Sequence, residues 1–161
     1  MIIFAADFFV EHYRGGAELT TEAIYEASLI PAPKVVTQLV TPDIMEKNKH
    51  YLWVFGNFHN LSDQSLLYAI KNLKYVVMEY DYKYCSFRSP EKHVEMQGKC
   101  DCHDSKRGKL VSMFLNSSVM TWWMSHNQKN RYQEVFPFLS DKNNRVLNSV
   151  LSEETLEYIE A

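Results

Sequence analysis

The chain has 161 residues, of which 46% are hydrophobic and 23% charged, as in an ordinary globular domain. Its net charge of −3 disfavours a nucleic-acid partner, because such proteins usually carry a basic excess. The length predicts a single domain over residues 1–161. The odd number of cysteines argues against a secreted disulfide framework, and no apolar run reaches the ~18 residues of a membrane span. We therefore expect a cytoplasmic protein with no transmembrane segment.

Apolar or β-branched runs alternate along the chain with stretches of helical periodicity. The runs predicted as strands are 2–6, 34–40, 51–55, 74–78, 119–123 and 145–148. The predicted helices are 17–28, 42–47, one that begins after Ser62, 105–116, 126–135 and one that opens at 152–154. Thr41, Ser62 and Ser125 are predicted N-caps. Residues 79–104 show no periodicity and are predicted as a long loop, a feature that is often functional.

This alternation predicts an α/β fold, a Rossmann-like and mostly parallel sheet of about six strands with helices on both faces. Ligands of such sheets bind beyond the carboxyl ends of the strands. The loops expected there are 7–16, 56–60, 79–104, 124–125 and 148–149.

The loop after the first predicted strand excludes the common nucleotide sites of this architecture. Its only glycines are the pair Gly15-Gly16, so there is neither a dinucleotide fingerprint nor a P-loop. A phospho-receiver domain is also excluded, since Gly56-Asn57 stand where its carboxylate would follow the third strand. The glycines precede a predicted helix. A helix N-terminus with glycines suits a phosphate or a cluster of sugar hydroxyls, although the pair could merely shape a turn.

Four segments resemble a known family: 2–9 (IIFAADFF), 14–20 (RGGAELT), 76–82 (VVMEYDY) and 146–150 (VLNSV). They are similar to the N-terminal, acceptor-side domain of GT-B-fold, group-1-like glycosyltransferases. The resemblance implies an acceptor-binding domain of an enzyme that transfers sugar from a nucleotide-sugar donor. In that family a second domain holds the donor, and the chain ends about where it would begin. We therefore expect the chain to need a donor-binding domain or subunit for activity.

The resemblance also implies roles for individual residues. Gly15 and Gly16 match the glycine loop near donor phosphates and acceptor, Glu18 matches the acidic residue that opens the next helix, and Glu79 and Asp81 follow a strand where the family places acceptor contacts. The full predicted substrate-binding set is Asp7, Arg14, Gly15, Gly16, Glu18, Asn57, Glu79, Asp81 and Ser125. The resemblance implies a sugar or sugar-phosphate acceptor and a nucleotide-sugar co-substrate, requires no cofactor, and assigns no catalytic residue.

Polar residues of the predicted loop 79–104 allow further interpretations. Glu79 and Asp81 could form an acid/base pair, or an acidic strand end paired with Lys74 or Lys83. The basic residues in and beside this loop, Arg88 among them, could hold an anionic acceptor or form a solvated surface.

A zinc site is an alternative for the same loop. Cys85, Cys100, Cys102 and His103 supply three thiols and an imidazole, with His93 nearby, and structural zinc sites use such ligands. Against zinc, the usual spacing of paired ligands is absent, and idle thiols are common.

An alternative function is a non-catalytic binding or scaffold protein on the same fold. It would self-associate, for example as a homo-oligomer, or dock a partner through exposed aromatic residues such as Phe58 or Trp123.

Overall fold

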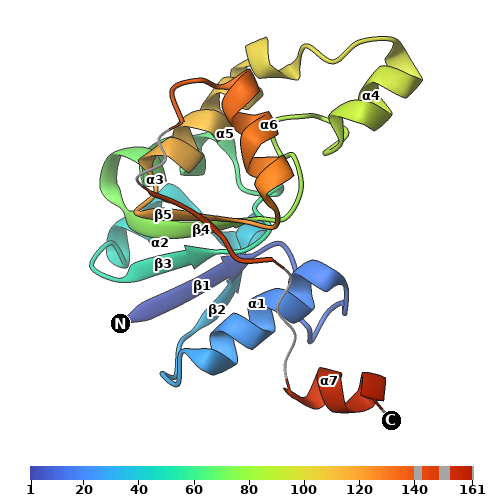
Figure 1. Cartoon of the computed structure of the whole chain (residues 1–161). Helices are drawn as coiled ribbons and strands as arrows, with labels where there is room; N and C mark the ends of the chain where they lie inside the picture. Colours follow the sequence, from blue (N-terminus) through green and yellow to red (C-terminus); the bar gives the residue numbers. More distant parts are fainter. Residues whose placement is uncertain (140–142, 149–152, 161) are drawn as a thin grey trace.

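In a computed structural model, which describes residues 1–139, 143–148 and 153–160, the chain forms an α/β fold around a six-stranded sheet (Figure 1). The strand order is β2-β1-β3-β4-β5-β6, and all neighbouring strands are parallel. The strands are β1 (Ile2–Ala6), β2 (Lys34–Val36), β3 (Leu52–Phe55), β4 (Lys74–Glu79), β5 (Met120–Trp123) and β6 (Asn144–Val146). The predicted Rossmann-like parallel sheet is therefore confirmed.

Seven α-helices lie in the described part of the chain. They are α1 (Gly16–Ala27), α2 (Pro42–Lys47), α3 (Asp63–Asn72), α4 (Pro90–Gln97), α5 (Lys106–Ser117), α6 (His126–Val135) and α7 (Glu153–Glu160). The side chains of Thr41, Ser62 and Ser125 accept hydrogen bonds from backbone N–H groups in the first turns of α2, α3 and α6. These three predicted N-caps are confirmed.

Side chains alternate between the two faces of the sheet, as the pleat of a β-strand requires. Ile3, Trp53 and Tyr75 belong to a large buried cluster that α2, α3, α5 and α6 cover. Phe4 and Val54 belong to a smaller cluster on the opposite face, which α1 covers (Figure 1). Both faces of the sheet thus carry buried apolar side chains, which explains why the strand sequences are continuous hydrophobic runs.

The structure differs from the sequence-based expectation in two places. The second strand stops at Val36, because Thr37–Leu39 turns into a short 3-10 helix. The predicted loop 79–104 contains α4 and a second 3-10 helix, Cys102–Asp104. The helix α4 escaped detection because only Pro90 and His93 of its eight residues are buried, so it has no apolar stripe. Ser149 and the expected helix start at Ser152 lie outside the described residues.

Among the helices described, none has both the length and the apolar character needed to cross a membrane.

Candidate functional site: a polar pocket at the carboxyl edge of the sheet

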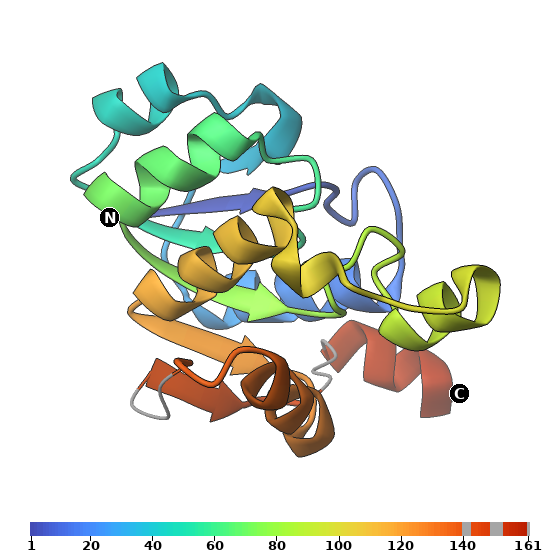
Figure 2. The ribbon, with the colours of Figure 1, turned by 90° about the horizontal axis from the view of Figure 1, so that it is seen from above.

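The carboxyl ends of the strands meet at one edge of the sheet, and the loop after β1 and the segment after β4 lie at that edge (Figure 2). A pocket of about 770 Å³ opens there, a volume usual for small-molecule sites. Its wall combines the loop after β1, the start of α1, the loop after β3 and Arg88 from the segment after β4.

Five of the nine residues predicted to bind substrate line this pocket. They are Asp7, Gly15, Gly16, Glu18 and Asn57. The pocket also contains residues outside the predicted substrate-binding set. The exposed rings of Phe8 and Tyr13 are among them, and such rings offer flat apolar faces.

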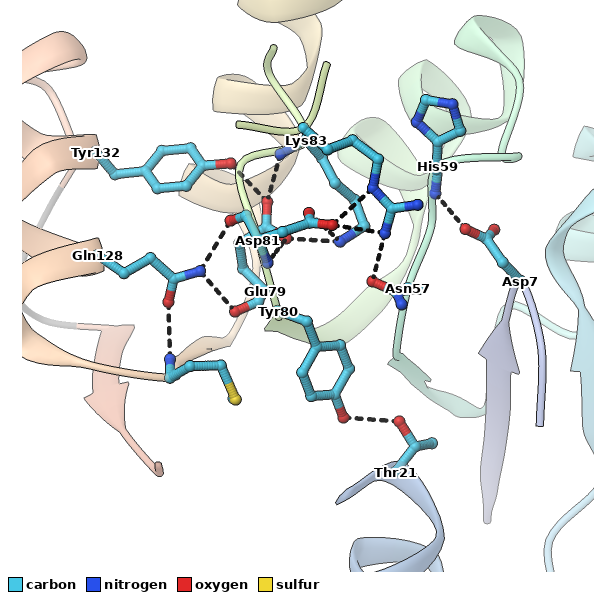
Figure 3. Close-up of polar contacts among 12 residues, drawn as sticks. Asp7, Thr21, Asn57, His59, Glu79, Tyr80, Asp81, Lys83, Gln128 and Tyr132 are labelled. Carbon is cyan, nitrogen blue, oxygen red and sulfur yellow. Dashed lines mark hydrogen bonds and ion pairs between the residues drawn. The ribbon is translucent and has the colours of Figure 1, made fainter. Parts of the chain in front are cut away.

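Asp7 holds the pocket wall in place. It is buried at the end of β1. Its Oδ2 accepts a hydrogen bond from the backbone N–H of His59 at 2.8 Å (Figure 3). Its Oδ1 accepts one from the N–H of Asn60 at 3.0 Å. The hydroxyl of Thr37 donates to the same Oδ1. With both oxygens engaged, Asp7 ties the loop after β3 to β1, so we assign it a positioning role.

The glycine pair shapes the start of α1. The backbone N–H of Gly15 donates to Glu18 Oε2 at 3.1 Å. A Cβ at Gly15 would lie 2.6 Å from that oxygen and 2.7 Å from a ring carbon of Tyr13, whereas a Cβ at Gly16 would meet no atom within 4 Å. Gly15 offers no side-chain cap to the helix, and first-turn N–H groups have no intrahelical acceptor. The Glu18 carboxylate already holds the Gly15 N–H, and the N–H groups that follow can donate to a ligand oxygen on this side of the pocket.

Arg88 brings a fixed positive charge to the pocket. Its Nε donates to Asp81 Oδ2 at 2.6 Å, and one of its terminal nitrogens donates to Asn57 Oδ1 at 3.3 Å. The side chain remains 34% exposed, and a guanidinium has five N–H donors. It can therefore hold Asp81 and Asn57 and still donate to a ligand.

Glu79 lies in the interior instead of in the pocket. It is fully buried and accepts hydrogen bonds from Lys83 Nζ at 2.7 Å and from the Tyr132 hydroxyl at 2.5 Å (Figure 3). Lys83 Nζ also lies 2.9 Å from Asp81 Oδ1. Burial raises the pKa of Glu79, and the Lys83 ammonium opposes this shift. The sequence left two interpretations open for Glu79 and Asp81, an acid/base pair or an acidic strand end paired with a lysine. The geometry matches the second interpretation, with Lys83 as the lysine.

The remaining predicted residues occupy other positions. Ser125 is half-buried as the N-cap of α6. Arg14 is exposed and, with Tyr158 of α7, lines a separate hollow of about 330 Å³. The α6 residue Gln128 supports the site from behind, because its Nε2 donates to the backbone oxygens of Glu79 at 3.0 Å and Asp81 at 2.8 Å.

His59 lines the pocket, and its pKa is lower than that of an ordinary histidine. Burial lowers its pKa below 6.5, and the positive charge of Arg88 lowers it further, while Asp7 opposes both effects. The imidazole is therefore neutral at pH 7 and can accept or donate one hydrogen bond.

No protein-family model matches this chain, and no curated protein shows significant similarity to it. The function must therefore be argued from the pocket itself. The resemblance to glycosyltransferases stays a prediction.

A cluster that could hold a metal lies outside the pocket. The Sγ atoms of Cys85, Cys100 and Cys102 and a ring nitrogen of His93 all lie within 4.8 Å of one another. The fourth group is His93 instead of the predicted His103, which is only part-buried and pairs with Asp104 at 3.4 Å. His93 lies on α4, which brings its ring back towards the thiols, and this helix could not be recognised from the sequence.

The aromatic residues expected to dock a partner are not available for docking. Phe58 and Trp123 are both 0% exposed. The ring of Phe58 packs at a tilt against Phe114, and that of Trp123 against Tyr132. Both rings pack under the helices that cover the large buried cluster on one face of the sheet. The expectation of exposed aromatic rings at these positions was therefore wrong.

Proposed function

We propose that the pocket binds a sugar or sugar phosphate and that the chain is the acceptor-binding domain of a nucleotide-sugar-dependent glycosyltransferase. The observation that carries the proposal is the composition of the pocket wall. The N-terminus of α1 and the Arg88 guanidinium supply positive potential, Asn57 and Glu18 supply polar groups, and Phe8 and Tyr13 supply exposed rings.

Each of these groups matches one part of a glycosyl phosphate. A helix N-terminus and an arginine both bind phosphate oxygens. Amide and carboxylate side chains satisfy sugar hydroxyls with directed hydrogen bonds. The flat apolar face of a sugar ring packs on an exposed aromatic ring. On this proposal a second domain or subunit binds the nucleotide-sugar donor, and the pocket presents the acceptor to it.

The proposal is tested by titrating isotopically labelled protein with glucose 1-phosphate, methyl glucoside and inorganic phosphate, one at a time, and following amide shifts. We expect glucose 1-phosphate to shift Gly15, Gly16 and Asn57 most strongly. Inorganic phosphate should shift the glycines more weakly. Shifts confined to other parts of the chain, or none across a wider panel of sugars and sugar phosphates, would refute the proposal.

A pair of variants separates binding from folding. Gly16→Ala adds a methyl group that meets no protein atom, so the chain should fold normally while the methyl occupies the pocket and weakens binding. Arg88→Met should weaken glucose 1-phosphate more than methyl glucoside, because only the former is charged. Lys49→Met serves as the control, since Lys49 is exposed and, within the described part of the chain, forms an ion pair with Glu46. Equal affinities for all three variants would contradict the pocket assignment.

A further inference from the structure

The segment after β4 contains a helix that the hydrophobic core does not hold. The exposed fractions of Val94 and Met96 in α4 are 46% and 67%, and only Pro90 and His93 of that helix are buried. A helix of eight residues is marginal on its own. In Figure 2 it stands at the margin of the molecule, beyond the carboxyl edge of the sheet. Little apolar packing therefore fixes α4 itself, although residues on both sides of it, Cys85 and Cys100 among them, pack on the core.

Four metal-binding side chains converge where the segment folds back. Cys85 precedes α4, His93 lies within it, and Cys100 and Cys102 follow it. All three cysteines are free thiols, and the Cys85 and Cys100 sulfurs lie 3.7 Å apart, too far for the ~2.05 Å of a disulfide. The cluster thus joins both ends of the segment to its middle.

Three of the six distances within the cluster match a tetrahedral site, and all six are within 4.8 Å. Bond lengths of about 2.3 Å for Zn–S and about 2.0–2.1 Å for Zn–N place two sulfurs about 3.8 Å apart, and a sulfur and a nitrogen about 3.6 Å apart. The Cys85 and Cys100 sulfurs are 3.7 Å apart. His93 Nδ1 lies 3.5 Å from the Cys85 sulfur and 3.4 Å from the Cys102 sulfur.

Neighbouring groups prepare the ligands for a metal ion. His93 Nε2 lies 3.1 Å from Gln97 Oε1. Because an amide oxygen only accepts, Nε2 carries the proton and the Nδ1 lone pair faces the thiols. The ring is stacked on Phe87 at 4.4 Å. The backbone N–H of Ser86 donates to the Cys102 sulfur at 3.5 Å, as expected for a thiolate ligand.

We infer that Cys85, His93, Cys100 and Cys102 bind a structural zinc ion that holds the segment between β4 and α5. Three thiolates and one imidazole are a ligand set that zinc prefers. All four tetrahedral positions come from the protein, so the site leaves no open position for catalysis. Binding replaces the S–H proton of each cysteine with a Zn–S bond, and the three protons pass to solvent.

The zinc ion also fixes one wall of the pocket. Arg88 lies between Cys85 and His93 in the sequence, and its backbone N–H donates to the Cys85 oxygen at 2.9 Å. Arg88 has a φ of +57°, a conformation that a non-glycine residue keeps only when its surroundings enforce it. A zinc ion on Cys85 and His93 provides that restraint on both sides. The zinc assignment does not depend on the proposed function of the pocket.

The direct test is the metal content of the full-length chain, expressed in zinc-supplemented medium and purified under reducing conditions without chelator. We expect close to one zinc ion per chain by mass spectrometry of the metals. Replacement by cobalt should give the visible bands of tetrahedral Co²⁺ and a sulfur-to-cobalt charge-transfer band. Metal content far below one per chain, iron in place of zinc, or an octahedral cobalt spectrum would overturn the inference.

Matched variants identify the ligands. His93→Gln should lower zinc affinity and change the cobalt spectrum, whereas His103→Gln, ten positions along the chain, should leave both unchanged. Affinity is measured by competition with a chromophoric chelator, after circular dichroism has confirmed that each variant is folded. If His93→Gln does not fold, Cys102→Ser replaces it, since Cys102 is only half-buried. Equal zinc affinity in the ligand variant and in His103→Gln would refute the ligand set.

Discussion

Lys83 gives the sharpest test of how the carboxyl edge is held together. Its ammonium is 1% exposed and lies 2.7 Å from Glu79 Oε1, which is 0% exposed. Lys83→Met removes the cation and leaves the buried Glu79 carboxylate without a positive partner. Breaking a buried ion pair from one side costs about 3–5 kcal/mol. That is a large share of the ~5–15 kcal/mol by which a domain of this size is stable.

The chain contains a matched control. Lys49 and Glu46 form an ion pair of the same length, 2.7 Å, but their side chains are 55% and 53% exposed. Exposed pairs contribute about 0–1 kcal/mol. Lys49→Met should therefore change the free energy of unfolding by less than about 1 kcal/mol. The two variants differ chiefly in the burial of the pair that they break, although Lys83→Met also removes the contact with Asp81.

The assay is urea denaturation at pH 7, followed by circular dichroism. A loss below about 1 kcal/mol for Lys83→Met, equal to that of Lys49→Met, would refute the reasoning. The double variant Glu79→Gln/Lys83→Met removes both charges and should be more stable than Lys83→Met alone, because no unpaired charge remains. A double variant no more stable than Lys83→Met would equally contradict a charge-based explanation.

The pH dependence of Lys83→Met carries a definite sign. Burial raises the pKa of Glu79, and loss of the neighbouring ammonium raises it further. Between the unfolded pKa, near 4.5, and the folded pKa, the folded chain keeps a proton that the unfolded chain releases. Stability of the variant is therefore highest at low pH and falls as the pH rises through this window, by at most about 1.4 kcal/mol per pH unit. A flat profile from pH 4.5 to 7 would be incompatible with an unpaired Glu79.

Three further predictions concern the rest of the site. In Gly108→Ala the new Cβ would clash with the backbone oxygen of Cys102. The variant should therefore lower the free energy of unfolding in urea by about 1–3 kcal/mol and weaken zinc binding. Unchanged values for both would contradict this contact. Gln97→Ala removes the oxygen that accepts a hydrogen bond from the His93 ring. It should lower zinc affinity about 10–100-fold, measured by chelator competition. An unchanged affinity would show that this hydrogen bond does not orient the ring. His59 should titrate below 6.5 by NMR, and Arg88→Met should raise its pKa. Because the folded pKa is depressed, the stability linked to His59 is present above pH 6.5 and is lost as the pH falls towards the folded value; a pKa of 6.5 or above in the native protein would refute the shift.

The parallel sheet could be predicted because its signals are local. Continuous apolar runs such as Ile2–Ala6 and Leu52–Phe55 identify strands that are buried on both faces. Capping residues such as Ser62 and Ser125 mark helix starts by a hydrogen bond that spans only three residues. Short-range chemistry of this kind is visible in the sequence without knowledge of the fold.

The pocket could be predicted only where the signal lay at the end of a strand. Asp7 follows β1 directly, Asn57 is the second residue after β3, and both line the pocket. Arg88 lies nine residues after the end of β4, and its contact with Asn57 spans 31 positions. Sequence alone gave no reason to separate it from the other basic residues of its segment. Glu79 ends its strand too, but Lys83 and Tyr132 hold it in the interior.

The metal ligands show the same limit. The three cysteines were evident, but the choice between His93 and His103 depends on α4, which has no apolar stripe to reveal it. His103 is adjacent to Cys102 in the sequence and therefore looked like the better partner. His93 Nδ1 nevertheless lies within 3.5 Å of two of the thiols, because the helix carries it back across the segment.

Arg88 contacts both the buried ion cluster around Lys83 and the metal-ligand cluster around Cys85. Experiments on Arg88 can therefore separate what each cluster contributes to ligand binding. Its guanidinium is held by Asp81, which Lys83 also contacts, and its backbone is held next to Cys85. Lys83→Met and zinc removal should therefore both weaken binding of glucose 1-phosphate in the pocket, but Lys83→Met should make stability fall more steeply between pH 4.5 and 7 than zinc removal does. If zinc removal leaves binding unchanged while Arg88→Met abolishes it, the buried ion cluster alone positions the guanidinium. If zinc removal and Arg88→Met both leave binding unchanged, Arg88 does not contact the ligand.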